Sequence, residues 1–91
     1  MNREELKQLL SIVDEALSKI LLAERTIDKR MREKAIRDAK SEAQSMVYPY
    51  KAFLTDICHK EYLGDELFDW GHLEGDLQDV YTKLKELYNT I

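Results

Sequence analysis

The first half of the chain is one uninterrupted stretch of helix-compatible sequence. Residues 2–48 contain neither glycine nor proline, the two residue types that most strongly oppose a helix interior. Apolar residues recur along this stretch at spacings of three and four, which is typical of one face of an α-helix. Asn2 can cap its start, with Glu5 reaching back in a capping box. The pattern predicts a long helix over residues 2–48.

The length of this helix constrains the fold. A straight helix over residues 2–48 would measure roughly 70 Å, whereas a compact domain of this size has a radius of gyration of only about 12 Å. We expect the helix to stay straight and to need something else to cover it. The alternative is a bend near Glu24–Asp28, where Thr26, followed by Asp28, would cap a second helix.

The second half of the chain predicts two shorter helices. Pro49 disfavours helical geometry at the residue before it and suits the first turn of the next helix, so residues 48–50 form a connector. A helix over 50–63 follows, with Gly64 placed as its C-terminal cap. After an acidic connector over 64–72, apolar residues spaced 4-3-4-3-4 predict a C-terminal helix over 73–91, with a seam formed by Leu73, Leu77, Val80, Leu84, Leu87 and Ile91.

The two halves carry complementary apolar residues. The long helix offers an aliphatic stripe, which widens at Ile20-Leu21-Leu22, and all eight aromatic residues lie from Tyr48 onward. We therefore expect an all-α fold, in which a long N-terminal helix packs antiparallel against two or three shorter helices in a single domain over 1–91. The shorter helices would not cover the whole stripe, so the leftover surface predicts a homodimer.

Composition favours a soluble binding protein and gives no sign of catalysis. The chain is 44% hydrophobic and 35% charged, without the long apolar run of a membrane span. A single cysteine, Cys58, fits a reducing compartment, so we expect a cytoplasmic protein without membrane contact. Cys58, His59 and His72 have no metal-ligand spacing, and no glycine-rich phosphate loop is present. We expect no enzyme activity, metal or cofactor.

Charge is strongly segregated along the chain. Residues 25–40 carry seven basic and three acidic side chains, and residues 61–79 carry seven acidic side chains and no lysine or arginine. The basic segment also contains opposite charges three or four residues apart, which predict ion pairs along an exposed helix. If this face instead tracks a phosphate backbone, the protein is a nucleic-acid-binding regulator with Lys29, Arg30, Arg37 and Lys40 as contacts.

The acidic segment carries the main functional hypothesis. Phe68 and Trp70 stand among its carboxylates, and aromatic anchors ringed by charge resemble interface hot spots. The sequence therefore predicts a small protein–protein interaction module, acting as an adaptor, regulator or inhibitor, that binds a partner with a basic surface. The predicted contacts, referred to below as the acidic–aromatic set, are Glu61, Asp65, Glu66, Phe68, Asp69, Trp70, Glu74 and Asp76.

Overall fold

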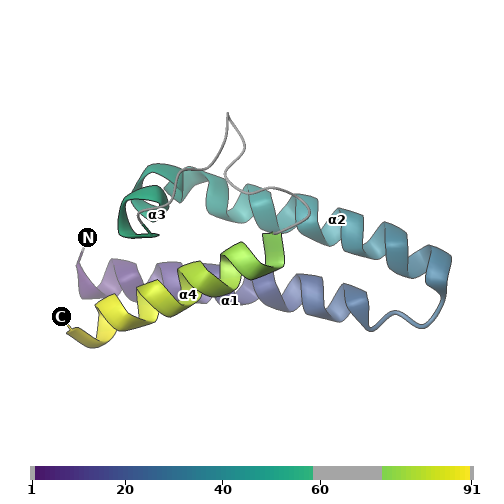
Figure 1. The fold of residues 1–91 in the computed structure, drawn as a ribbon, viewed down its shortest axis with the longest axis horizontal. Coiled ribbons are helices and arrows are strands. Elements are labelled where there is room, and N and C mark those ends of the chain that lie inside the picture. The colour runs from purple at the N-terminus through teal and green to yellow at the C-terminus, as the bar shows by residue number, and fades with distance from the viewer. Residues whose placement is uncertain (1, 59–72, 91) are drawn as a thin grey trace.

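The protein is a small helical bundle. The computed structural model describes residues 2–58 and 73–90. Within these ranges the chain forms α1 (Arg3–Glu24), α2 (Lys29–Val47), the short 3₁₀ turn η1 (Tyr48–Tyr50), α3 (Lys51–Cys58) and α4 (Leu73–Thr90), and no strand (Figure 1). The predicted all-α class and helical bundle are confirmed.

The prediction of one long helix over 2–48 is wrong, and the alternative bend is correct. The chain leaves helical structure after Glu24 and re-enters it at Lys29, so that α1 and α2 form an antiparallel hairpin (Figure 1). The largest dimension of the molecule is 44 Å, too short for a straight helix of roughly 70 Å. Folding back lets α2 bury its own apolar face against α1, whereas a straight helix would leave that face in water.

Local capping explains where the break falls. The Asn2 side chain accepts a hydrogen bond from the Glu5 backbone N–H at 2.8 Å, as the sequence predicts for the start of α1. At the second start the cap is Asp28 rather than Thr26, because the Asp28 Oδ1 accepts from the Met31 backbone N–H at 3.1 Å. Capping of this kind satisfies a backbone donor that the first helical turn leaves unpaired.

The two helices of the hairpin are offset along their length. The Lys19 Nζ lies 3.1 Å from the Glu42 Oε1, so in an antiparallel pair Glu24 stands level with about residue 37. The first roughly two turns of α2 therefore extend past the end of α1, as Figure 1 shows at the hairpin end. Side chains on this overhang have no α1 residue opposite them.

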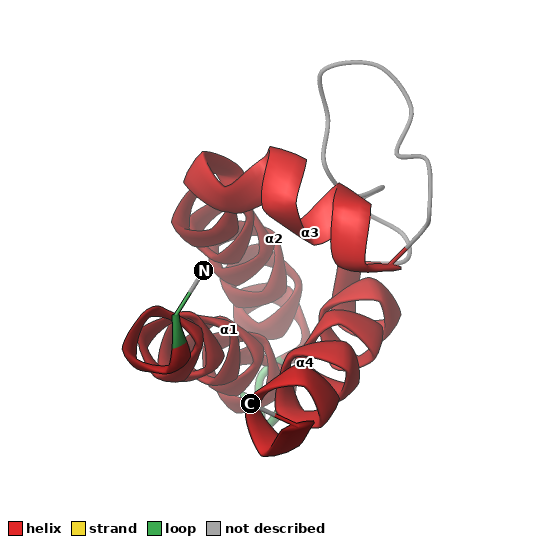
Figure 2. Ribbon diagram, turned by 90° about the vertical axis from the view of Figure 1, so that its left-hand side faces the viewer, coloured by secondary structure: helices red, strands yellow, loops and turns green. Residues whose placement is uncertain are grey.

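The core lies between α1, α2 and α4. Seen from the end of the bundle, these three helices surround a common centre and α3 lies across α2 and α4 (Figure 2). On α2 the buried residues include Ala39 and Ala43, which form an alanine row on the side of the helix that faces the core. Four residues of the predicted α4 seam, Leu73, Leu77, Val80 and Leu84, are also buried, Leu87 is partly buried, and Ile91 lies outside the described residues. Fifteen apolar residues form the described core: Leu6, Leu9, Val13, Ala16, Leu17, Ile20, Ala23, Ala39, Ala43, Val47, Leu54, Leu73, Leu77, Val80 and Leu84.

The later helices agree with the sequence where the structure describes them. Pro49 sits in η1, and α3 begins at Lys51, one residue after the expected start. The expected end of that helix near residue 63 and the connector over 64–72 lie outside the described residues. α4 begins at Leu73 as predicted. Within residues 2–58 and 73–90, no helix combines the length and the hydropathy that a bilayer-spanning segment requires.

Candidate interaction surfaces

Two members of the acidic–aromatic set lie in the described part of the chain. Glu61, Asp65, Glu66, Phe68, Asp69 and Trp70 lie outside it. Glu74 and Asp76 stand in the first turn of α4, where negative charge favours the positive end of the helix dipole. Asp76 is only 7% exposed, so its side chain has little surface to offer a partner. Glu74 is therefore the member of the acidic–aromatic set that the described structure places at the surface.

Glu74 lies beside Glu24, the last residue of α1. Its side chain forms a hydrogen bond with Glu24. This bond raises the pKa of Glu24 above its ordinary value, and burial and the repulsion between the two carboxylates raise it further, while Lys40 on α2 lowers it. Glu74 of the acidic segment and Lys40 of the basic segment thus both act on the carboxyl group of Glu24.

Replacing Glu24 with glutamine should stabilise the protein slightly near pH 7. Because the pKa of Glu24 is higher in the folded protein than its unfolded value of 4.5, the protonated carboxyl stabilises the fold. This stabilisation is complete below pH 4.5 and is lost as the pH rises through the pKa of the folded state. Glutamine removes the repulsion and still donates a hydrogen bond to Glu74. Because Glu24 is largely exposed, water screens the effect and we expect less than about 0.5 kcal/mol.

Urea unfolding of the Glu24→Gln variant at two pH values checks this expectation. The gain over the unaltered protein should be present near pH 7 and disappear near pH 4, where the Glu24 carboxyl is protonated. Glu15→Gln, on an exposed position of the same helix, is the control and should show no such pH dependence. An equal gain at both pH values would contradict the assigned repulsion.

The described residues show no grouping of metal ligands. Among residues 2–58 and 73–90, no group of three or more histidine, cysteine, aspartate or glutamate residues is placed to hold a metal ion. His59 and His72 lie outside these ranges, and Cys58 closes α3. The structure therefore does not test whether these three residues bind a metal ion.

The four basic contacts predicted for nucleic acid do not share one face. Lys29, Arg30 and Arg37 are exposed, whereas Lys40 is half-buried and acts on Glu24. Lys29 and Arg30 are consecutive and so point about 100° apart on the helix. Arg30 and Arg37, seven residues apart, do stand on the same side of α2. Lys34 shares that side, and the sequence reading did not single it out.

The charge pairs expected along α2 are not formed. Among the described residues, none of Asp28–Arg32, Lys29–Glu33, Glu33–Arg37 and Lys34–Asp38 makes an ion pair. Asp28 instead caps α2, and the Arg32 guanidinium donates to the Thr26 carbonyl at 3.4 Å. The cations on the outer side of α2 are therefore not held by neighbouring carboxylates of their own helix.

The hairpin end exposes large apolar side chains. Five such residues are exposed in the described structure, and four of them flank the break between α1 and α2. Their exposed fractions are 41% for Leu21, 64% for Leu22, 95% for Ile27 and 66% for Met31; we call these four the hairpin-end cluster. The wide stripe at Ile20-Leu21-Leu22 signalled part of this surface in the sequence. The sequence did not reveal the offset of the helices, which uncovers Met31, or the break in the helix, which leaves Ile27 exposed in the connection.

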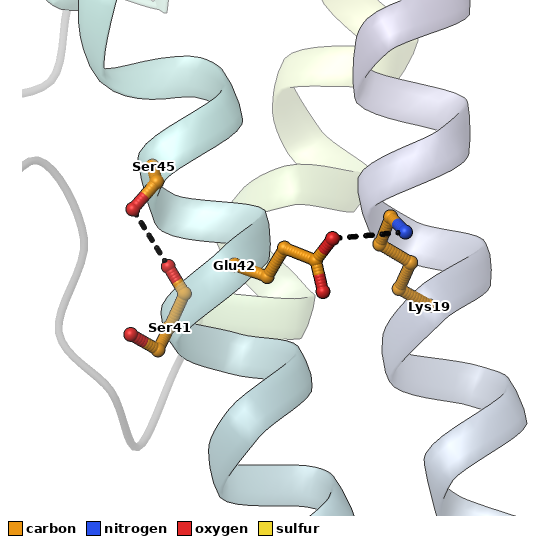
Figure 3. Close-up of polar contacts among 4 residues, drawn as sticks. All are labelled: Lys19, Ser41, Glu42 and Ser45. Atoms are coloured by element: carbon orange, nitrogen blue, oxygen red, sulfur yellow. Dashed lines mark hydrogen bonds and ion pairs between the residues drawn. The ribbon is translucent and has the colours of Figure 1, made fainter.

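The fifth exposed apolar side chain lies on a different surface. Tyr48, at the end of α2, is 49% exposed. With Ser41, Gln44, Ser45 and Pro49 it is among the described residues that line an open hollow of about 370 Å³. Ser41 and Ser45 lie on the side of α2 away from α1, opposite the Glu42–Lys19 ion pair (Figure 3). The Ser45 hydroxyl donates to the Ser41 carbonyl at 3.0 Å.

Comparisons with known proteins add no relative. The chain matches no protein-family model, no curated protein and no solved structure. Function is therefore argued from the surfaces of the molecule alone.

Proposed function

We propose that this protein is a small protein–protein interaction module, an adaptor, regulator or inhibitor, that docks its partner on the hairpin-end cluster. The observation that carries the proposal is the gathering of Leu21, Leu22, Ile27 and Met31 at one end of the bundle with 41–95% of each exposed. Isolated exposed apolar residues are ordinary on protein surfaces, but contiguous groups of them are typical of interaction sites.

The basic residues around the cluster indicate the chemistry of the partner. Arg25, Lys29 and Arg30 are exposed beside it, against Glu24 and Asp28. A symmetric contact between two copies would bring these cations together, and like charges across an interface oppose binding. The surface is better matched by another protein with an apolar centre and an acidic rim. The acidic–aromatic set remains a prediction for a second, basic partner.

The energetic scale is sufficient for a specific contact. Complete burial of one such side chain contributes about 1.5–3 kcal/mol, so a partner that covers the cluster gains most from Ile27 and Met31. Because both side chains are exposed in the free protein, replacing them removes binding surface and leaves the core intact.

A paired substitution tests the proposal. Ile27→Ser with Met31→Gln should leave the helical circular dichroism and the melting temperature unchanged. The variant should lose a binding partner that the immobilised unaltered protein retains from cell extract. After purification, that partner should bind the variant at least about thirtyfold more weakly by calorimetry, which corresponds to one interface hot spot. Gln8→Ser, at an exposed position near the start of α1, is the control and should bind normally.

Two results would contradict the proposal. Equal binding of the identified partner to the variant and the unaltered protein would place the interface elsewhere. Light scattering is the second measurement: a particle of twice the 10.7 kDa chain mass that becomes a monomer in the variant would show that the cluster binds a second copy. A monomer in both cases is the expected result, in place of the homodimer that the straight helix predicted from the sequence.

A further inference from the structure

A second surface on the described structure combines cations with an exposed aromatic ring. Arg30, Lys34, Arg37, Ser41 and Tyr48 are spaced 4-3-4-7 along α2, which places them on one side of the helix. All five are exposed. Tyr48 keeps helical backbone angles, with φ −54° and ψ −41°, so the spacing holds to the end of the row. We call these residues the outer stripe of α2.

The outer stripe faces away from the core and from the hairpin-end cluster's α1 residues. Ser41 belongs to the stripe, and Figure 3 shows it on the side of α2 opposite α1. Glu42, the next residue, turns toward Lys19 instead. The stripe is therefore a surface separate from the helix–helix contact, and its use would not require α2 to move.

The spacing of the cations suits a row of phosphates. Successive residues Arg30, Lys34 and Arg37 rise by roughly 4.5–6 Å along the helix axis, comparable to the step between neighbouring phosphates of an extended strand. None of the three makes an ion pair within the described residues. Cations that are free of carboxylates can release counterions from a nucleic acid on binding, which is the main source of its affinity.

Tyr48 adds an exposed aromatic ring to the row of cations. Tyr48 is 49% exposed, and the Lys51 ammonium lies 5.8 Å from the centroid of its ring. Exposed aromatic rings beside a cationic track are typical of sites where unpaired bases stack. Gln44, Ser41 and Ser45 line the hollow next to the ring, and their amide and hydroxyl groups can bond to base edges.

We propose that the outer stripe of α2 binds single-stranded nucleic acid, with Arg30, Lys34 and Arg37 along the phosphates and Tyr48 stacked on a base. This proposal does not rest on the protein-binding function, because the outer stripe contains none of the four apolar residues of the hairpin-end cluster and shares only Arg30 with its basic rim. It also revises the contacts expected from the sequence: Arg30 and Arg37 remain, Lys34 and Tyr48 enter, and Lys29 and Lys40 leave the set.

Salt dependence tests the role of the cations. Binding of a fluorescent oligothymidylate of roughly twelve nucleotides, followed by anisotropy, should weaken with salt with a log–log slope of about −2 for three phosphate contacts on a single strand. Arg37→Gln should reduce the magnitude of that slope by about 0.7. Lys7→Gln, which removes the same charge from an exposed position on α1, should leave the slope unchanged.

Tyr48 provides a second and independent readout. Tyr48→Ala should weaken binding by about 5- to 150-fold, the range for loss of one stacked base, without changing the salt slope. Tyr48→Phe keeps the ring and should restore binding. Circular dichroism should confirm that each variant is folded.

Several outcomes would overturn the proposal. The first is the absence of binding at low salt. The second is tighter binding to a duplex of the same length, because paired bases cannot stack on Tyr48. The third is equally tight binding to heparin or polyglutamate with no effect of Tyr48→Ala, which would show a general attraction for polyanions, acidic proteins included.

Discussion

Replacing Ile20 with alanine should lower the free energy of unfolding by about 3–4 kcal/mol, within the range measured for deletion of a large buried aliphatic side chain. Ile20 is fully buried near the end of α1, where α1 packs on both α2 and α4. The substitution removes apolar contacts and leaves a cavity that the surrounding helices can fill only in part. A domain of this size is stable by about 5–14 kcal/mol, so the loss is a large fraction of the total.

Ile27→Ala is the matched control for this substitution. It deletes the same atoms seven residues later, but Ile27 is 95% exposed, so we expect a change within about 0.5 kcal/mol. Thermal unfolding separates the two cases: the Ile20 variant should melt roughly 12–25 °C lower, and the Ile27 variant at the temperature of the unaltered protein. Similar losses in both variants would show that Ile27 is buried in solution, either within the chain or in a dimer.

Replacing Ala43 with leucine should destabilise the protein by about 2–3 kcal/mol, at the upper end of the usual cost of overpacking a core. Ala43 is fully buried in the alanine row with which α2 packs on α1. A leucine there forces strained rotamers or pushes the two helices apart. A loss of this size is expected only if the chain folds back at residues 25–28.

Ala52→Leu serves as the control for this overpacking, because Ala52 is exposed on α3 and leucine should be tolerated there within about 0.5 kcal/mol. Chemical unfolding of both variants measures the difference. A neutral or stabilising effect of Ala43→Leu would contradict the hairpin, since a solvent-facing alanine tolerates a larger residue.

The candidate surfaces could be found only in part from the sequence. The basic character of residues 25–40 was plain from composition. Arg30, Lys34 and Arg37 stand out as candidate contacts because they form no ion pair within the described residues, and ion pairing depends on which carboxylates lie near which cations. Sequence spacing predicted ion pairs between neighbouring charges on α2, but Asp28 is used as a helix cap. Exposed ion pairs contribute so little energy that other local contacts decide such geometry.

The place of Tyr48 in the candidate site could not be predicted from the sequence either. In the sequence it marks the break before Pro49, and no pattern connects it with basic residues up to eighteen positions earlier. Helical backbone angles at Tyr48 carry the periodicity of α2 through to its ring. The Tyr48 ring and the cations therefore lie on the same side of α2, although they are distant in sequence.

What the sequence determined by itself is the helical content and the inward faces. The spacing of apolar residues in α1, α2 and α4 predicted the side that each buries, and Asn2 and Leu73 marked where helices begin. These features follow from local periodicity and capping, which act within a few residues. They need no knowledge of neighbours.

Only the tertiary structure decided whether residues 2–48 form one helix or two, and which apolar residues stay uncovered. Arg25–Asp28 carries no glycine or proline, so local propensity alone favours continuing the helix. The chain breaks there because folding back buries the alanine row of α2 against α1, a gain that depends on residues far apart in sequence. The same packing sets the offset between the helices, which leaves Met31 on the overhang of α2 exposed, while Ile27 is exposed in the connection between α1 and α2.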